Sequence, residues 1–243
     1  MDQNHKLAKA TGLVLADPEQ YRRLTGRLIY LLATRPDLAY AVHILSQFMH
    51  TPQEEHWLAG LKVVRYLKGT VGQGVIFRAN TAFSLTGWCD ADWGACPTSR
   101  RSLTGWIIQF GASPITWKTK KQEGVSLSST EAEFRALRSI TKEVIWLKEL
   151  LRELGLPHAD AVTICCDNKS AIHLSANPIL HEQTKHMGII CSFVRHEIAK
   201  GVIKVTYVPT TEQFADILTK ALGRKEFNTF LLKLGIYNIH APT

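Results

Sequence analysis

Apolar side chains recur at helical spacing through the first eighty residues. One stripe runs through Tyr21, Leu24 and Leu28. Stripes of this kind predict helices that bury one face and leave the other in water. Each predicted helix opens with a start signal, at Asp17-Pro18, Pro36 and Thr51-Pro52. We therefore expect residues 1–80 to form a helical segment.

From residue 74 the pattern changes to short apolar runs separated by turn residues. The first runs, at 74–77, 85–89, 104–110 and 115–117, are closely spaced, which favours antiparallel pairing. A long helix is expected from Ser128 to Leu154, and the later strands, at 162–166 and 202–208, are separated by helices. Antiparallel strands followed by helix-linked strands predict an α/β fold whose mixed sheet has helices on both faces.

Four acidic side chains stand at the edges of these predicted elements. Asp90 and Asp167 each end an apolar strand, and sites in α/β sheets form at the carboxyl ends of strands. Glu133 lies on the buried stripe of the long helix, and Asp216 lies in the second turn of the helix expected after the last strand. Taken singly, each is more simply a cap, a turn residue or a surface charge. Together they could hold two Mg²⁺ ions, which prefer oxygen ligands and can promote phosphodiester hydrolysis.

The phase of the long helix separates two neighbouring glutamates. Glu131 and Glu133 are two positions apart and so point about 200° apart on a helix. Ser128 and Glu131 have the spacing of a capping box, in which the glutamate reaches back to the helix start. Glu133 is in register with Leu137 on the buried stripe. We therefore assign Glu131 to capping and Glu133 to the acidic cluster.

The net charge of +8 favours an anionic partner, most commonly nucleic acid. Basic side chains on the N-terminal helices fit either solvated helix faces or a phosphate-tracking surface: Arg22, Arg23, Arg27, Lys62, Arg65 and Lys68. A second basic group lies beside the predicted strands at 104–110 and 115–117: Arg100, Arg101, Lys118, Lys120 and Lys121.

The cysteine pattern and the hydropathy indicate the cellular compartment in which we expect the protein. The five cysteines are odd in number and include no CxxC pair, which indicates buried free thiols rather than disulfides or zinc ligands. No apolar run approaches the roughly 18 residues of a membrane span, and the N-terminus has no signal-peptide pattern. We expect a protein of the cytoplasm or the nucleus without membrane association.

Long stretches of the chain carry a family resemblance. The RNase H domain of copia-type LTR retrotransposon Pol polyproteins is similar to five of them: WCDADWGACPTSRRSLTGW, ITWKTKKQEGVSLSSTEAEF, CCDNKSAIHLSANP, TKH and YVPTTEQFADILTKAL. The segment that connects the polymerase to that domain resembles YRRLTGRLIYLLATRPDLAYAVHILSQFM and VVRYLKGT. The resemblance implies an RNase H-like mixed sheet of five strands. It divides the chain into a connection segment at 1–80, an RNase H-like domain at 83–222 and a helical tail at 223–243.

The resemblance also implies an activity and a site. RNases H hydrolyse the RNA strand of RNA–DNA hybrids at a D-E-D-D metal site, which places Asp90, Glu133, Asp167 and Asp216 as catalytic residues and ligands of two Mg²⁺ ions, with Mn²⁺ as an alternative. The substrate would be recognised by its shape, through the RNA 2′-hydroxyls and the backbone. The implied nucleic-acid contacts are Arg100, Arg101, Lys118, Lys120, Lys121, Asn168 and Lys185.

Departures from the family pattern keep a second function open. The chain contains no Asp-Asp dipeptide, so the polymerase palm and its activity should be absent. Gly188 and Ser192 stand where the family has an acidic residue and a histidine, which is typical of a relic copy. The alternative is a catalytically silent remnant that acts only as a nucleic-acid-binding or structural module.

An integrase-like strand transferase would instead order its acids as two aspartates and a glutamate. Met1 resembles an internal methionine of the polyprotein, which leaves open both a truncated reading frame and a processed product.

Overall fold

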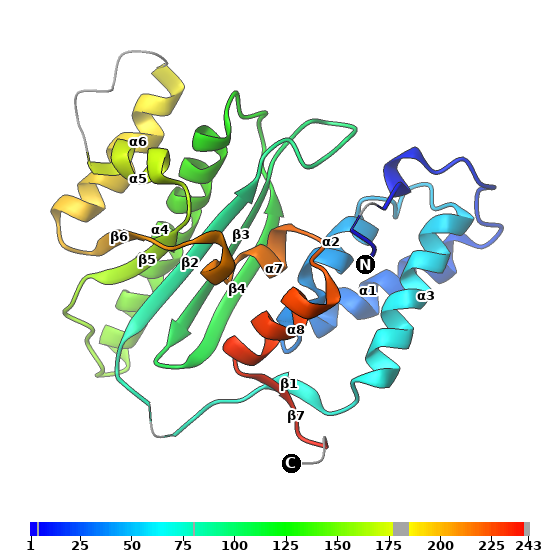
Figure 1. Ribbon diagram of the computed structural model, residues 1–243, viewed down its shortest axis with the longest axis horizontal. Coiled ribbons are helices and arrows are strands. Elements are labelled where there is room, and N and C mark those ends of the chain that lie inside the picture. Colours follow the sequence, from blue (N-terminus) through cyan, green and yellow to red (C-terminus); the bar gives the residue numbers. More distant parts are fainter. Residues whose placement is uncertain (4, 80, 177–184, 241–243) are drawn as a thin grey trace. The chain divides into compact units, whose positions relative to one another are not determined.

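The computed structural model describes residues 1–240 apart from 4, 80 and 177–184 (Figure 1). The chain divides into two compact units, one made of Met1–Phe77 with Lys220–Thr243 and the other of Arg78–Thr219. The tail expected to stand apart at 223–243 therefore groups with the N-terminal helices. The division into domains at 1–80, 83–222 and 223–243 remains a prediction. Within the described residues, no helix is both long enough and apolar enough to span a bilayer.

The first unit is mainly helical, as the apolar stripes predict. Asp17 caps its first long helix, since the carboxylate accepts hydrogen bonds from the backbone nitrogens of Glu19 and Gln20 at 3.0 and 3.2 Å. Tyr21 is fully buried in the core of this unit and donates a 2.8 Å hydrogen bond to the Leu45 carbonyl. The helices are η1 (Leu7–Lys9), α1 (Pro18–Leu31), η2 (Pro36–Leu38), α2 (Ala39–Ser46), α3 (Glu54–Gly69) and α8 (Arg224–Lys233).

A short two-stranded sheet also belongs to the first unit. Strand β1 (Gln73–Val75) pairs antiparallel with β7 (Ile236–Asn238). The strand expected at 74–77 is thus present in part, but it does not join the main sheet. Its partner was not predicted, because three residues after a helix carry too little pattern to indicate a strand.

The second unit contains the predicted mixed sheet of five strands. The strands are β2 (Leu85–Asp92), β3 (Leu103–Phe110), β4 (Ser113–Lys121), β5 (Val162–Cys166) and β6 (Ile203–Tyr207), in the spatial order β4-β3-β2-β5-β6. Neighbours from β4 to β2 pair antiparallel, whereas β2, β5 and β6 run parallel. Both kinds of pairing follow the expectation from strand spacing.

Helices cover both faces of this sheet (Figure 1). The long helix α4 (Ser129–Glu153) packs on one face with α5 (Lys169–Ala176) and α6 (Lys185–Ala199), over a core that includes Ile140 and Ile164. The other face carries a short segment that contains η3 (Thr210–Glu212) and α7 (Asp216–Thr219). This segment corrects the expectation of one continuous helix there, since Asp216 is the first residue of α7 rather than part of a second turn.

Helix α7 lies close to the sheet because a glycine faces it. A Cβ atom built at Gly105 would lie 2.6 Å from Thr219 Cγ2, 2.8 Å from Leu218 Cβ and 3.2 Å from the Ala215 carbonyl oxygen. Gly105 pairs with Asp90 across β3 and β2. The missing side chain therefore allows α7 to approach the sheet beside Asp90.

We expect Gly105→Ala to destabilise the protein by about 1–3 kcal/mol, the usual cost of overpacking a core. Gly87→Ala is the matched control on the neighbouring strand, because its added Cβ would meet the end of the flexible Ile140 side chain at 2.7 Å. Urea unfolding of both variants gives the comparison. A smaller loss for Gly105→Ala than for Gly87→Ala would contradict the close packing of α7.

Candidate metal and nucleic-acid site

Four elements bring the predicted acidic residues together at one edge of the sheet. Asp90 lies near the end of β2, Asp167 directly follows β5, Glu133 lies in the first turns of α4 and Asp216 begins α7. Oxygens of Asp90, Asp167 and Asp216 lie within 4.8 Å of one another. A Glu133 oxygen lies within the same distance of Asp167 and of the Cys166 sulfur. The acidic cluster, as we call these four carboxyl groups, thus forms where the parallel strands β2 and β5 end.

Hydroxyl groups hold two of the aspartates in place. Thr219 donates a short hydrogen bond from Oγ1 to Asp90 Oδ2, and Thr210 donates to Asp167 Oδ2 at 2.8 Å. Asp90 is 1% exposed, so its charge is removed from water and depends on such partners. The sequence analysis missed both threonines. The only available signal was that they share the quoted stretch YVPTTEQFADILTKAL with Asp216.

Glu133 has one satisfied oxygen and one without a partner. Its Oε1 accepts a 3.2 Å hydrogen bond from the Ala91 backbone nitrogen, whereas the buried Oε2 has no hydrogen-bond partner. Burial, together with the neighbouring Asp90, Cys166 and Asp167, raises the pKa of Glu133 to about 10. A buried carboxyl oxygen that lacks a donor among other carboxylates fits a divalent cation, which would supply the missing positive charge.

Glu131 has a different environment, as the helix phase predicts. Ser128 Oγ accepts a 3.1 Å hydrogen bond from the Glu131 nitrogen and caps α4. Glu131 Oε2 accepts a 2.8 Å hydrogen bond from the backbone nitrogen of Leu127, one residue before the expected N-cap position. Its other oxygen forms a 2.8 Å ion pair with Arg135. Glu131 is thus committed to the start of the helix.

A buried glutamine connects three elements of the site. Gln213 Nε2 lies 2.9 Å from the Cys89 carbonyl oxygen and 3.4 Å from that of Cys165, so it bridges β2 and β5 one or two residues before Asp90 and Asp167. Its Oε1 accepts from the Ala215 nitrogen at 3.2 Å. Gln213 is fully buried and three positions before Asp216. The relative placement of the aspartates therefore depends on this amide, which the sequence analysis also missed.

The second basic group lies at the same end of the sheet as the acidic cluster. Leu103 pairs with Asp92 on one side and with Lys121 on the other, so the start of β3 and the end of β4 lie beside the end of β2. Arg100 and Arg101, both exposed, precede that start. A nucleic-acid backbone that crossed the sheet at the acidic cluster would pass close to these basic side chains.

Each remaining predicted contact residue has a defined position. The Lys120 ammonium group forms a 3.1 Å ion pair with Glu123. The Lys121 ammonium group lies 3.7 Å from the Cys96 sulfur. The Lys118 ammonium group lies 6.0 Å from the centre of the Trp106 ring. Asn168 caps α5 by accepting a 2.9 Å hydrogen bond from the Ala171 nitrogen. Lys185 begins α6, and its side chain lies outside the described residues.

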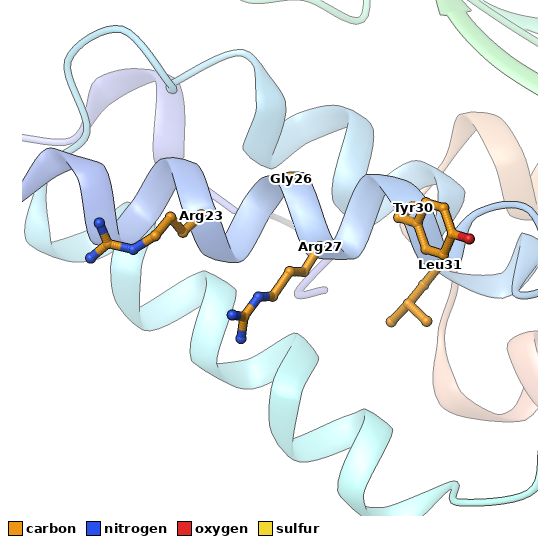
Figure 2. A pocket seen from close by; sticks show the side chains of 5 residues that line it. All are labelled: Arg23, Gly26, Arg27, Tyr30 and Leu31. Atoms are coloured by element: carbon orange, nitrogen blue, oxygen red, sulfur yellow. The ribbon is translucent and has the colours of Figure 1, made fainter.

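A separate basic surface lies on α1 in the first unit. Figure 2 shows Arg23 and Arg27 one helical turn apart on one side of this helix, beside a surface pocket of about 540 Å³. Gly26 adds no side chain between them, and Tyr30 is 84% exposed. Arg23 makes an exposed ion pair with Asp17 at 3.5 Å, and such a pair contributes little to the stability of the fold. Positive charge beside an exposed ring suits an anionic partner, so phosphate contact by this surface stays a hypothesis.

No protein-family model matches this chain. The retrovirus-related Pol polyprotein from transposon RE2 of Arabidopsis thaliana is 42% identical over 234 residues, which is 96% of this chain and 16% of the polyprotein. The corresponding polyprotein from transposon TNT 1-94 of Nicotiana tabacum is 38% identical over 219 residues, 90% of this chain and 16% of its own length. Among solved structures, LC11-RNase H1 in complex with an RNA/DNA hybrid has a TM-score of 0.44 and 12% identity, covering 56% of this chain and 93% of that one.

The sheet order and the helices on both faces define an α/β module with an RNase H-like fold. The chain belongs to the family of retrovirus-related Pol polyproteins from copia-type transposons, as the resemblance implied. It spans 16% of the length of the Arabidopsis thaliana and Nicotiana tabacum polyproteins.

The raised pKa of Glu133 predicts how stability varies with pH in EDTA. Between about pH 4.5 and pH 10 the unfolded glutamate is ionised, whereas the folded one holds its proton. The folded state therefore binds more protons, and this group lowers the stability of the wild type as the pH rises. Glu133→Gln has no such proton to lose, so its stability relative to the wild type should increase with pH. Thermal unfolding across this range measures the effect.

Glu131→Gln is the control, because it removes a carboxyl group from the same helix outside the acidic cluster. Divalent metal should then stabilise the wild type more than Glu133→Gln. Parallel pH profiles for the wild type and Glu133→Gln would contradict the buried, proton-holding state of this carboxyl.

Proposed function

We propose that the chain is a metal-dependent endonuclease that hydrolyses the RNA strand of RNA–DNA hybrids. The observation that carries the proposal is the acidic cluster, in which Asp167 lies close both to Glu133 and to the pair Asp90 and Asp216, and in which the buried Glu133 Oε2 has no hydrogen-bond partner. A structural role would leave Glu133 and Asp167 paired with arginine or lysine. Their hydrogen-bond donors are instead a backbone nitrogen and a hydroxyl group, and among the residues that the structure describes no ion pair joins either carboxyl group to a cation.

Asp90, Glu133, Asp167 and Asp216 would hold two divalent ions, most simply Mg²⁺ or Mn²⁺. Bound there, the metal would supply an activated water and would stabilise charge on the leaving oxygen of a phosphodiester. The protein's part is to fix the ligands before the substrate arrives. Thr219 and Thr210 orient two of the carboxylates, and the Gln213 bridge keeps β2 and β5 in register beside them.

The basic residues give the proposal its substrate class. Arg100 and Arg101 precede β3, the neighbour of β2, and Lys120 lies near the end of β4, the next strand along the sheet. They would therefore meet the backbone of a nucleic acid whose scissile phosphate lies at the acidic cluster. Contacts of this kind position a duplex without reading its sequence. Discrimination of RNA from DNA would then rest on the 2′-hydroxyl.

The alternative is a silent remnant that binds nucleic acid or has a structural role only. Gly188 and Ser192 on α6 favour it, because both depart from the family pattern. The intact acidic cluster favours the enzyme, since four converging carboxyl groups lower stability unless they serve a bound cation. Binding without cleavage would distinguish the remnant from the enzyme.

The purified chain should cleave the RNA strand of a labelled RNA–DNA hybrid with Mg²⁺ and not with EDTA. Glu133→Gln should lower the rate by at least about 100-fold, because even the partners that orient metal ligands contribute about 10–100-fold. Glu131→Gln should change it little, since a capping box accepts glutamine. Absent cleavage with retained hybrid binding would establish the remnant. An inactive Glu131 variant beside an active Glu133 variant would reverse the assignment.

Hybrid binding should depend on salt through Arg101 and Lys120. Each lost phosphate contact reduces the slope of log K against log salt by about 1, because fewer counterions are released. The double change Arg101→Gln with Lys120→Gln should therefore flatten the slope by about 2. The control removes the same charge elsewhere, as Arg152→Gln with Lys204→Gln, and should keep the wild-type slope. Equal slopes for both double variants would indicate that the basic group is an ordinary solvated surface without phosphate contacts.

A further inference from the structure

The acidic cluster contains a sulfur atom that the proposed nuclease does not use. Cys166 is the last residue of β5 and is fully buried. Its Sγ lies within 4.8 Å of one carboxyl oxygen each from Glu133 and Asp167, and those two oxygens lie within 4.8 Å of each other. Three potential ligand atoms from two elements thus surround one point. Magnesium binds oxygen and leaves a thiol unused, whereas zinc and cadmium bind thiolate strongly.

A second observation points to a cation at the same place. Glu133 is 5% exposed, and its Oε2 has no hydrogen-bond partner, although Oε1 is held by the Ala91 nitrogen. The side chains of Cys89 and Cys166 are hydrogen-bonded to each other across β2 and β5. A thiol beside a metal-bound sulfur can donate to it, as the outer partners of metal ligands commonly do.

We propose that Glu133, Cys166 and Asp167 form a mixed sulfur and oxygen site for a thiophilic divalent cation of the Zn²⁺ or Cd²⁺ class. Three protein ligands with a fourth position left to water are a common arrangement for zinc. Asp167 is only partly buried, so the site has a route to solvent through this residue. The site was not apparent from sequence, because its ligands come from α4 and β5 and match no cysteine spacing motif.

The site shares Glu133 and Asp167 with the ions of the proposed nuclease. Thiophilic cations would therefore displace Mg²⁺ from these carboxylates and inhibit hybrid cleavage. This consequence rests on the proposed function, whereas binding of the thiophilic cation does not.

Cadmium binding to the full, reduced chain tests the site without reference to activity. Titration with Cd²⁺ in the absence of Mg²⁺ should produce the ultraviolet charge-transfer absorption of a sulfur–cadmium bond. Cys166→Ser should lose that absorption and weaken binding by more than about 10-fold, because a direct ligand matters at least as much as an orienting partner. Cys165→Ser is the matched control. Its thiol is also buried but points to the opposite face of β5, so binding should be unchanged.

Competition supplies a measurement that needs no variant. Excess Mg²⁺ should weaken Cd²⁺ binding to the wild type several-fold, since both ions would use Glu133 and Asp167. Equal absorption and affinity in Cys166→Ser and the wild type would overturn the proposal and leave an adventitious ion only. Cadmium binding indifferent to Mg²⁺ would overturn it as well. If Cd²⁺ binds as expected but the chain never cleaves hybrid, the proposed nuclease activity is contradicted and the proposed thiophilic site is supported.

Discussion

Repulsion among buried carboxyl groups is the constraint on which the second unit depends. Asp90, Glu133 and Asp216 are each at most 5% exposed, and Asp167 joins them at close range. Such a cluster is unfavourable unless donors or cations compensate it. Two threonine hydroxyls and one backbone nitrogen donate to carboxylates of the cluster, whereas the buried Glu133 Oε2 has no hydrogen-bond partner. This unpartnered oxygen distinguishes the cluster from a structural polar network, in which each group would be satisfied.

The geometry that holds the cluster comes from uncharged residues. Gln213 connects the carbonyl groups that precede Asp90 and Asp167, and Gly105 allows α7 to bring Asp216 and Thr219 to the sheet. Neither residue could be a metal ligand through a charged oxygen. Because each acts on backbone placement, a change at either position would move several carboxylates together rather than remove one.

Much of the fold and three of the four acids followed from sequence because each depended on local pattern. Asp90 and Asp167 end apolar strands, and the phase of α4 set Glu133 apart from Glu131. Asp216 was placed correctly in the cluster but on the wrong element, since a four-residue helix has too few positions to show periodicity. Gln213, Thr219 and Cys166 act through partners more than 30 residues away, and no spacing rule indicates such contacts.

Protonation and cation binding are alternative ways to relieve the same repulsion. Without a metal, burial and the acidic neighbours raise the pKa of Glu133, so this group keeps its proton and lowers the charge of the cluster. A cation that occupies the cluster must displace that proton, so metal affinity rises with pH. A thiol at the same point adds a ligand that Mg²⁺ does not use. In the proposed site, the burial of Glu133 would therefore couple its pKa to metal affinity, and Cys166 would determine which metals compete there.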